Sequence, residues 1–175
     1  MSTTPLPLRT LRTGTTVTEL GFGAAQLGNL FRETTDAAST EAVSTAFADG
    51  LRYFDTAPHY GLGLSERRLG AALRAVPRAS ITLSSKVGRL LVDSPETADR
   101  LDDDGFVVPA STRRVWDFSR DGVLRSVESS LGRLGTDHLD IAYLHDPDDH
   151  WDDASTTGID ALIELRDQGV VHAIG

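Results

Sequence analysis

The feature that most constrains this chain is a regular alternation of expected strands and helices. Apolar and β-branched runs predict strands near residues 20–24, 51–57, 80–88, 138–146 and 170–175. Segments with helical spacing lie between them, at 39–50, 65–75, 119–135 and 158–169. Short strand–helix–strand joints produce right-handed βαβ units, and such units build a parallel sheet. The pattern therefore predicts an α/β fold.

Two parallel-sheet architectures compete for this pattern, the open doubly wound sheet and the (β/α)8 barrel. An open dinucleotide-binding sheet carries Gly-x-Gly-x-x-Gly directly after its first strand. The near matches "GFGAAQ" at 21–26 and "GLGLSE" at 61–66 both lack the third glycine, because Gln26 and Glu66 stand there. We therefore expect a TIM barrel and interpret the glycine pairs as turn residues.

The length of 175 residues suits one ordinary domain, which we expect to span residues 1–175. A hairpin about Thr13–Gly14 is expected before the first strand. The expected strand at 170–175 gives four complete βα units and part of a fifth, whereas a closed barrel of this type has eight. We expect the chain to be the N-terminal part of a longer barrel, or to cover its open sheet edges by self-association.

One joint is much longer than the others, the segment 88–118 between the third strand and its helix. It has no clear periodicity, and loops of this length are usually functional or disordered. Because it contains Phe106, Trp116, Phe118 and the pair Arg113–Arg114, we expect a lid over the site, with a disordered insertion as the second choice.

Charge and composition exclude several classes of protein. The net charge of −9 argues against nucleic acid or an anionic membrane as the main partner, since both require clustered cations. The absence of cysteine rules out disulfides and thiolate metal sites. No apolar run reaches the length of a membrane helix, and the first residues lack a signal-peptide core, so we expect a cytoplasmic location.

Reactive side chains gather at the expected carboxyl ends of three strands, where barrel enzymes place their chemistry. Asp55 ends the second strand and Tyr60 follows it, Lys86 ends the third, and His145 ends the fourth. Lys86 is the single lysine in the chain, whereas arginine supplies every other cation. Because side chains alternate along a strand, Asp55, Lys86 and His145 can all point into one barrel interior.

These four residue types suit proton transfer at a carbonyl/alcohol pair. A tyrosine hydroxyl is a poor acid or base at neutral pH, because its free pKa is about 10. A nearby ammonium stabilises the phenolate, a carboxylate compensates the ammonium, and a neutral imidazole can donate a hydrogen bond to the substrate oxygen. None of them can move two electrons, so a hydride carrier is required.

The segments "YFDTAPHYG", "SSKVGR" and "LDIAYLHDPDD" resemble the catalytic segments of the aldo-keto reductase superfamily, and most closely its aldose 1-dehydrogenase subgroup. The resemblance covers essentially the whole chain. It implies a (β/α)8 barrel that opens with a hairpin across its base, here residues 8–19. It also implies hydride transfer between NAD or NADP and C1 of an aldose, or another carbonyl/alcohol pair, giving a lactone in the oxidative direction.

The resemblance also implies roles for individual residues. Tyr60 becomes the general acid/base, Lys86 tunes it, Asp55 holds Lys86, and His145 orients the oxygen of a sugar or aldehyde substrate. Gly23 and Asp55 become cofactor-binding residues. Members of the superfamily bind most of the nucleotide through strands five to eight, which lie outside the strands expected here.

Two alternatives in which the chain is not a complete enzyme remain open at this point. The chain is then either a truncated fragment or a non-catalytic barrel that serves as a binding or regulatory subunit. We expect no metal site, because the loop "HDPDDH" at 145–150 is typical of a solvated acidic segment. His138 and His172 stand at expected strand starts, where conserved positions of a barrel serve stability, and receive no role.

Overall fold

A parallel five-stranded sheet forms the centre of the computed structural model, which describes residues 6–175. Its strands are β3 (Phe22–Gly23), β4 (Tyr53–Asp55), β5 (Thr82–Val87), β8 (Leu139–Leu144) and β9 (Val171–Ile174), in that spatial order. All four pairings between neighbours are parallel. The strand order follows the chain order, as in the wall of a barrel, so the predicted partial (β/α)8 fold is confirmed.

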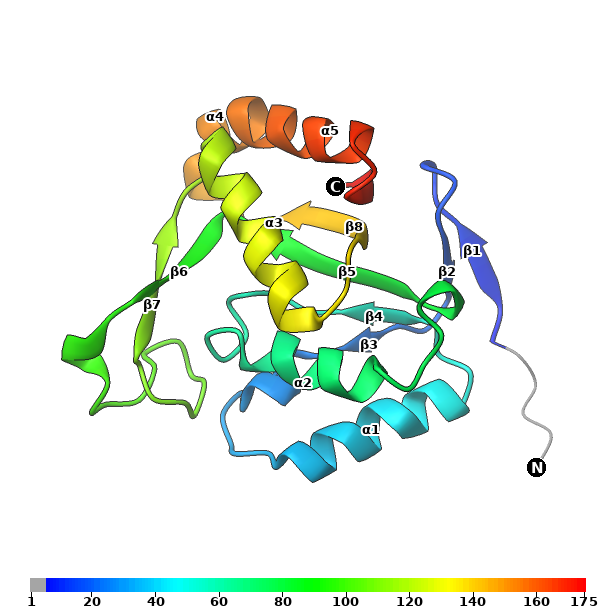
Figure 1. The fold of residues 1–175 in the computed structure, drawn as a ribbon, viewed down its shortest axis with the longest axis horizontal. Helices are drawn as coiled ribbons and strands as arrows, with labels where there is room; N and C mark the ends of the chain where they lie inside the picture. Colours follow the sequence, from blue (N-terminus) through cyan, green and yellow to red (C-terminus); the bar gives the residue numbers. More distant parts are fainter. Residues whose placement is uncertain (1–5) are drawn as a thin grey trace.

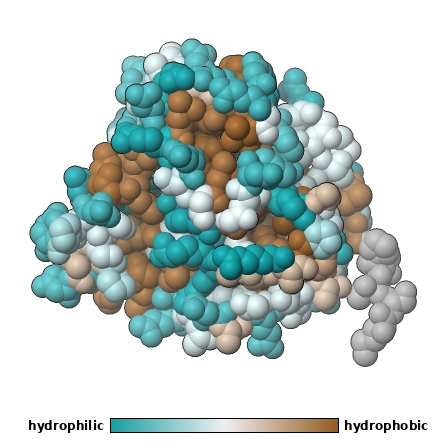
Figure 2. Space-filling view, viewed as in Figure 1, coloured by the Kyte–Doolittle hydropathy of each residue, from teal (hydrophilic) through white to brown (hydrophobic). Residues whose placement is uncertain are grey.

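Helices α1 (Asp36–Ala48), α2 (Leu64–Leu73), α3 (Arg120–Leu134) and α5 (Ile159–Asp167) cover one face of this sheet (Figure 1). Apolar residues of the strands, such as Phe54, Leu83 and Ala142, pack there against helical residues such as Leu69 and Val127. The sheet residues that alternate with them, including Tyr53 and Ser84, are polar and face the inside of the curve. The outer surface of the helical layer is mixed, with apolar patches between hydrophilic residues (Figure 2).

The helix boundaries follow local capping. Helix α1 begins three residues before the predicted start at residue 39, because the Thr35 side chain accepts a hydrogen bond from the Ala38 amide. Ser119 caps α3 in the same way, through the Gly122 amide. Gly135, with φ 69°, ends α3 in the left-handed conformation that glycine adopts without strain.

Helices α2 and α3 lie against each other across a buried ion pair. The Glu66 carboxylate is completely buried and accepts hydrogen bonds from Arg133 Nε at 2.5 Å and Ser85 Oγ at 2.7 Å. Nearby, a Cβ atom at Gly70 would lie 2.2 Å from the Leu134 carbonyl oxygen, so only glycine permits this approach of the helices. Glu66, which stands in place of the third glycine in the near match at 61–66, is thus a buried carboxylate with a structural role.

The predicted hairpin is formed by β1 (Leu8–Thr10) and β2 (Thr16–Thr18), which pair antiparallel. It attaches to the amino ends of the sheet strands. Thr82 Oγ1 donates to the Thr16 carbonyl oxygen at 2.8 Å, and the Arg52 amide donates to Thr18 Oγ1 at 3.1 Å. The hairpin therefore lies at the base of the sheet, at the opposite strand ends from Lys86.

The long segment 88–118 has regular structure, so the second choice of a disordered insertion is wrong, whereas its role as a lid stays a prediction. Strands β6 (Arg89–Asp93) and β7 (Thr112–Trp116) pair antiparallel over five residues each. Their connection contains the 3₁₀ turn Pro95–Thr97 and contributes Phe106 and Val108 to a second apolar cluster. This cluster also contains Leu62 and contacts Tyr60, so the segment packs onto the loop that carries the tyrosine.

The connection from β8 to α5 is also more helical than predicted. Residues Asp148–His150 form a 3₁₀ turn, α4 covers Trp151–Asp153, and a π-type turn at Ala154–Gly158 leads into α5. Within residues 6–175, none of the helices has the length and apolar character needed to cross a bilayer.

Candidate active site

Asp55 and Lys86 form a close ion pair at the carboxyl ends of β4 and β5. Lys86 Nζ donates to Asp55 Oδ2 at 2.6 Å and to the Thr56 carbonyl oxygen at 2.8 Å. Ser84 Oγ donates to the other carboxylate oxygen, Asp55 Oδ1, at 2.6 Å. These bonds engage both oxygens of Asp55 and two of the three ammonium hydrogens of Lys86.

A layer of hydroxyl groups lies below this ion pair. Ser84 Oγ, whose hydrogen is donated to Asp55, lies 3.1 Å from the Tyr53 hydroxyl oxygen, and the hydroxyls of Tyr53 and Tyr143 lie 3.3 Å apart. Burial raises the pKa of Tyr53 above its usual range, so this phenol stays neutral. The layer fills the inner face of β4, β5 and β8, as alternation along the strands predicts.

Tyr60 lies on the loop after β4, and its backbone position is fixed by contact between two glycines. A Cβ atom on Gly28 would lie 2.7 Å from the Tyr60 carbonyl carbon, and one on Gly61 would lie 2.2 Å from the Gly28 carbonyl oxygen. Gly61 also has a φ of 61°, in the left-handed region. Close backbone packing therefore holds Tyr60 where its ring meets Lys86.

The four predicted residues are brought together. Lys86 Nζ lies 4.8 Å from the centroid of the Tyr60 ring, within the range of cation–π attraction. The Tyr60 ring meets the His145 ring edge-on, with centroids 6.0 Å apart. A phenol, an ammonium, a carboxylate and an imidazole thus lie together at one end of the sheet, an arrangement that can carry proton transfer at a carbonyl/alcohol pair.

His145 is held in its neutral form. Burial, followed by the positive charges of Arg89 and Lys86, lowers its pKa to about 3, because each of these effects disfavours the charged imidazole. Its side chain is 6% exposed, and its buried Nδ1 has no hydrogen-bond partner among the described residues. A neutral imidazole in this position can donate one hydrogen bond to a substrate oxygen.

This burial predicts a stability that depends on pH. The pKa of a histidine in an unfolded chain is about 6.5, well above that of folded His145. As pH falls below about 6.5 His145 becomes protonated in the unfolded chain but stays neutral in the folded protein, so this residue alone decreases the free energy of unfolding by about 2 kcal/mol between pH 7 and pH 5. We expect His145→Gln to reduce this slope, measured by urea unfolding at pH 7, 6 and 5; an unchanged slope would contradict the assignment.

Residues 19–175 match the Aldo/keto reductase family. The chain belongs to the aldo/keto reductase family. It is 48% identical to D-threo-aldose 1-dehydrogenase of a Pseudomonas species over 165 residues, which are 93% of this chain and 50% of the relative. It is 36% identical to pyridoxal 4-dehydrogenase of Microbacterium luteolum over 181 residues, covering 94% of this chain and 53% of the relative. The chain thus spans about half the length of the curated relatives it matches.

Solved structures of aldo-keto reductases have the same fold. A putative aldo-keto reductase from Pseudomonas aeruginosa superimposes with a TM-score of 0.75 at 30% identity, over 96% of this chain and 58% of that one. The aldo-keto reductase of Klebsiella pneumoniae, solved in complex with NADPH, gives a TM-score of 0.64 at 25% identity, over 97% and 49% of the two chains. Both cover the sheet and the loops that carry the site.

Sequence analysis did not assign His59, Arg89 and Arg114 to this site, although all three lie beside it. Arg89 Nη1 lies 3.2 Å from His59 Nδ1, and Arg89 Nη2 donates to Asp146 at 2.5 Å. Arg114 donates to the His59 carbonyl oxygen at 2.8 Å. His59 packs edge-on against His145 at 5.3 Å, and burial, followed by the charges of Arg114 and Arg89, lowers its pKa to about 4. For His59, the sequence signal was its place directly before Tyr60. Arg89 and Arg114 lie on β6 and β7, two strands that were not predicted from the sequence.

Gly23, predicted to bind the cofactor, ends β3 directly beside Asp55 in the sheet register. A Cβ atom added at Gly23 would meet no atom within 4 Å, so the inner surface beside Asp55 is open. Open space next to a hydrogen-bonded carboxylate fits a flat nicotinamide ring.

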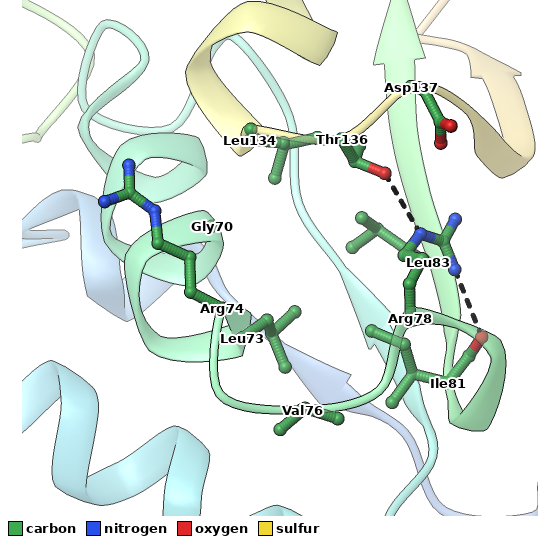
Figure 3. Close-up of a pocket in the computed structure, with 11 residues that line it drawn as sticks. Gly70, Leu73, Arg74, Val76, Arg78, Ile81, Leu83, Leu134, Thr136 and Asp137 are labelled. Atoms are coloured by element: carbon green, nitrogen blue, oxygen red, sulfur yellow. Dashed lines mark hydrogen bonds between the residues drawn. The ribbon is translucent and has the colours of Figure 1, made fainter.

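A cavity of about 510 Å³ lies elsewhere, between the C-terminal parts of α2 and α3 (Figure 3). Its lining includes Leu73, Arg78, Ile81 and Asp137, residues near the beginning of β5 and β8. It is therefore at the base of the sheet, away from Lys86. We assign the chemistry to the strand ends, because the tyrosine, lysine and histidine side chains converge there, whereas the residues that line the cavity include none of these types.

Proposed function

We propose that this aldo-keto reductase transfers hydride between a nicotinamide cofactor and C1 of an aldose. The observation that carries the proposal is the position of the Lys86 ammonium between the Asp55 carboxylate and the Tyr60 ring, with neutral His145 beside them. The name of the 48% identical relative, D-threo-aldose 1-dehydrogenase, supports an aldose as the substrate class.

In the proposed oxidation, Tyr60 Oη takes the proton of the C1 hydroxyl while the hydrogen on C1 departs with two electrons, and the C1–O single bond becomes the carbonyl of a lactone. Lys86 stabilises the phenolate that takes up this proton, and Asp55 keeps Lys86 in place. His145 donates a hydrogen bond to the C1 oxygen and so orients it. NAD or NADP, when bound, supplies the acceptor of the hydride.

We assign Gly23 and Asp55 to the cofactor side of the site. Gly23 leaves room for a flat ring, and the Asp55 carboxylate lies next to it in the sheet. Segment 88–118 is assigned to the substrate side, where Arg89 and Phe106 border His59 as part of a lid.

The proposal is tested by adding aldoses of the D-threo and L-fucose type to the natural full-length protein with NAD or NADP, and measuring reduction of the nucleotide. Sugar-dependent reduction and a lactone product are expected. A protein that binds nucleotide yet reduces none with any aldose or aldehyde would instead be a non-catalytic barrel.

Lys86→Arg tests the role of the ammonium. A guanidinium is planar and cannot replace the compact charge that donates to both Asp55 and Thr56. We expect kcat to fall by about 10²-fold, the lower range for loss of assisted proton transfer, with little change in nucleotide affinity. Steady-state kinetics and fluorescence titration with NAD(P)H measure the two quantities. Turnover close to that of the natural protein would refute the role.

A further inference from the structure

Two histidines and an aspartate converge at the base of the sheet, at the opposite strand ends from the proposed active site. His138 precedes β8, Asp140 lies on it, and His172 lies on the neighbouring strand β9. One ligand atom from each lies within 4.8 Å of the other two. We propose that His138, Asp140 and His172 bind a divalent transition-metal ion of the zinc type.

Asp140 is held so that one of its oxygens remains available. Its Oδ2 accepts a hydrogen bond from the Leu83 amide at 2.8 Å and pairs with Arg78 Nη2 at 2.6 Å. The other oxygen, Oδ1, lies 3.6 Å from His172 Nδ1. Two ligand atoms of a tetrahedral zinc ion are about 3.4 Å apart, given metal–ligand bonds of 2.0–2.2 Å. The Asp140–His172 pair is therefore already spaced for a shared ion.

His138 is oriented by a carboxylate of its own. Its Nδ1 lies 2.6 Å from Asp137 Oδ1, and this leaves Nε2 as the free ligand atom. Metal-binding histidines commonly bond a carboxylate through the nitrogen that does not hold the metal, which fixes the ring and raises its basicity. The His138 and His172 rings are stacked with centroids 4.7 Å apart, so both imidazoles lie side by side at the beginnings of β8 and β9.

Access and chemistry select the kind of ion. The side chains of His138 and His172 are 25% and 51% exposed, so an ion can reach them from solvent. Two imidazole nitrogens and one carboxylate oxygen suit zinc, cobalt or nickel, whereas magnesium and calcium prefer oxygen ligands. Three protein ligands leave the fourth position for water.

Arg78 limits the affinity of the site. Its guanidinium pairs with Asp140, and it also lines the 510 Å³ cavity next to Asp137 (Figure 3). A positive charge this close reduces the attraction of the carboxylate for a cation, so we expect micromolar and not nanomolar binding. An ion that joins the beginnings of β8 and β9 binds the folded chain only and raises its melting temperature.

The test uses metal-free natural full-length protein, titrated calorimetrically with Zn²⁺ alone, and the visible absorption of the Co²⁺ form. We expect one ion per chain and a cobalt spectrum of four-coordinate type. His172→Gln and His138→Gln should each weaken Zn²⁺ binding by at least about tenfold. His150→Gln, a change at a histidine outside the cluster, should leave it unchanged.

Circular dichroism and thermal melts without metal establish that the variants fold. We expect them to fold, because the substituted side chains His138 and His172 are partly exposed. Binding that is absent, or that survives both His138→Gln and His172→Gln, would overturn the proposal. These readouts do not depend on turnover, so failure of the metal site is distinguishable from failure of the proposed oxidoreductase activity.

Discussion

Tyr60→Phe is expected to lower kcat by about 10³-fold or more in the natural full-length protein, because it removes the proposed proton acceptor. The ring keeps its packing against His145 and Phe106, since the substitution deletes only the hydroxyl. General acid–base groups typically contribute 10²–10⁴-fold. Steady-state oxidation of an aldose measures the change in kcat.

Nucleotide affinity provides the internal control for this variant. The Tyr60 hydroxyl has no hydrogen bond to the described residues of the cofactor side, so the dissociation constant for NAD(P)H should change little. A Phe variant with normal turnover would refute Tyr60 as the acid/base. A variant that loses turnover and nucleotide binding together would indicate a collapsed loop, which circular dichroism in the near ultraviolet can detect.

Arg133→Met is expected to decrease the free energy of unfolding by about 3–5 kcal/mol. Glu66 is completely buried, and Arg133 supplies its compensating charge at 2.5 Å. Methionine preserves most of the apolar stem of the arginine but leaves the carboxylate unpaired, and an isolated buried charge is strongly destabilising. Urea unfolding followed by circular dichroism measures the loss.

The double variant Glu66→Gln with Arg133→Met separates charge from packing. A neutral amide can keep the hydrogen bond with Ser85 and no longer requires a cation, so we expect most of the stability to return. A double-mutant cycle should then give a coupling of several kcal/mol between the two positions. Additive effects would show that the ion pair is not what holds α2 to α3.

The sequence predicted the sheet and its reactive edge well, because both follow from short-range patterns. Alternation along the strands permits Asp55, Lys86 and His145 to point into one interior, and the register of β4, β5 and β8 in the structure places them on the same face. Parallel strands then bring their carboxyl ends to one edge. The proximity of Tyr60 follows from its place in the loop directly after β4.

The remaining features depend on contacts between distant segments, which a local pattern does not contain. Strands β6 and β7 are each five residues long and are separated by the connection through Phe106, so their pairing has no turn signature. Arg89 and Arg114 reach His59 only through this hairpin. Glu66 resembles a failed glycine motif in the sequence, and its burial is evident only when α3 supplies Arg133. His138 and His172 become neighbours only through the register of β8 and β9.

The contact between Gly28 and Gly61 indicates which residues can be substituted to alter substrate preference. Because two main chains in close contact set the backbone position of Tyr60, we expect substitutions of neighbouring side chains that do not pack on its ring to displace it little. Mutagenesis libraries aimed at new sugars or aldehydes are therefore best directed at His59 and at the 88–118 hairpin, with both glycines kept invariant.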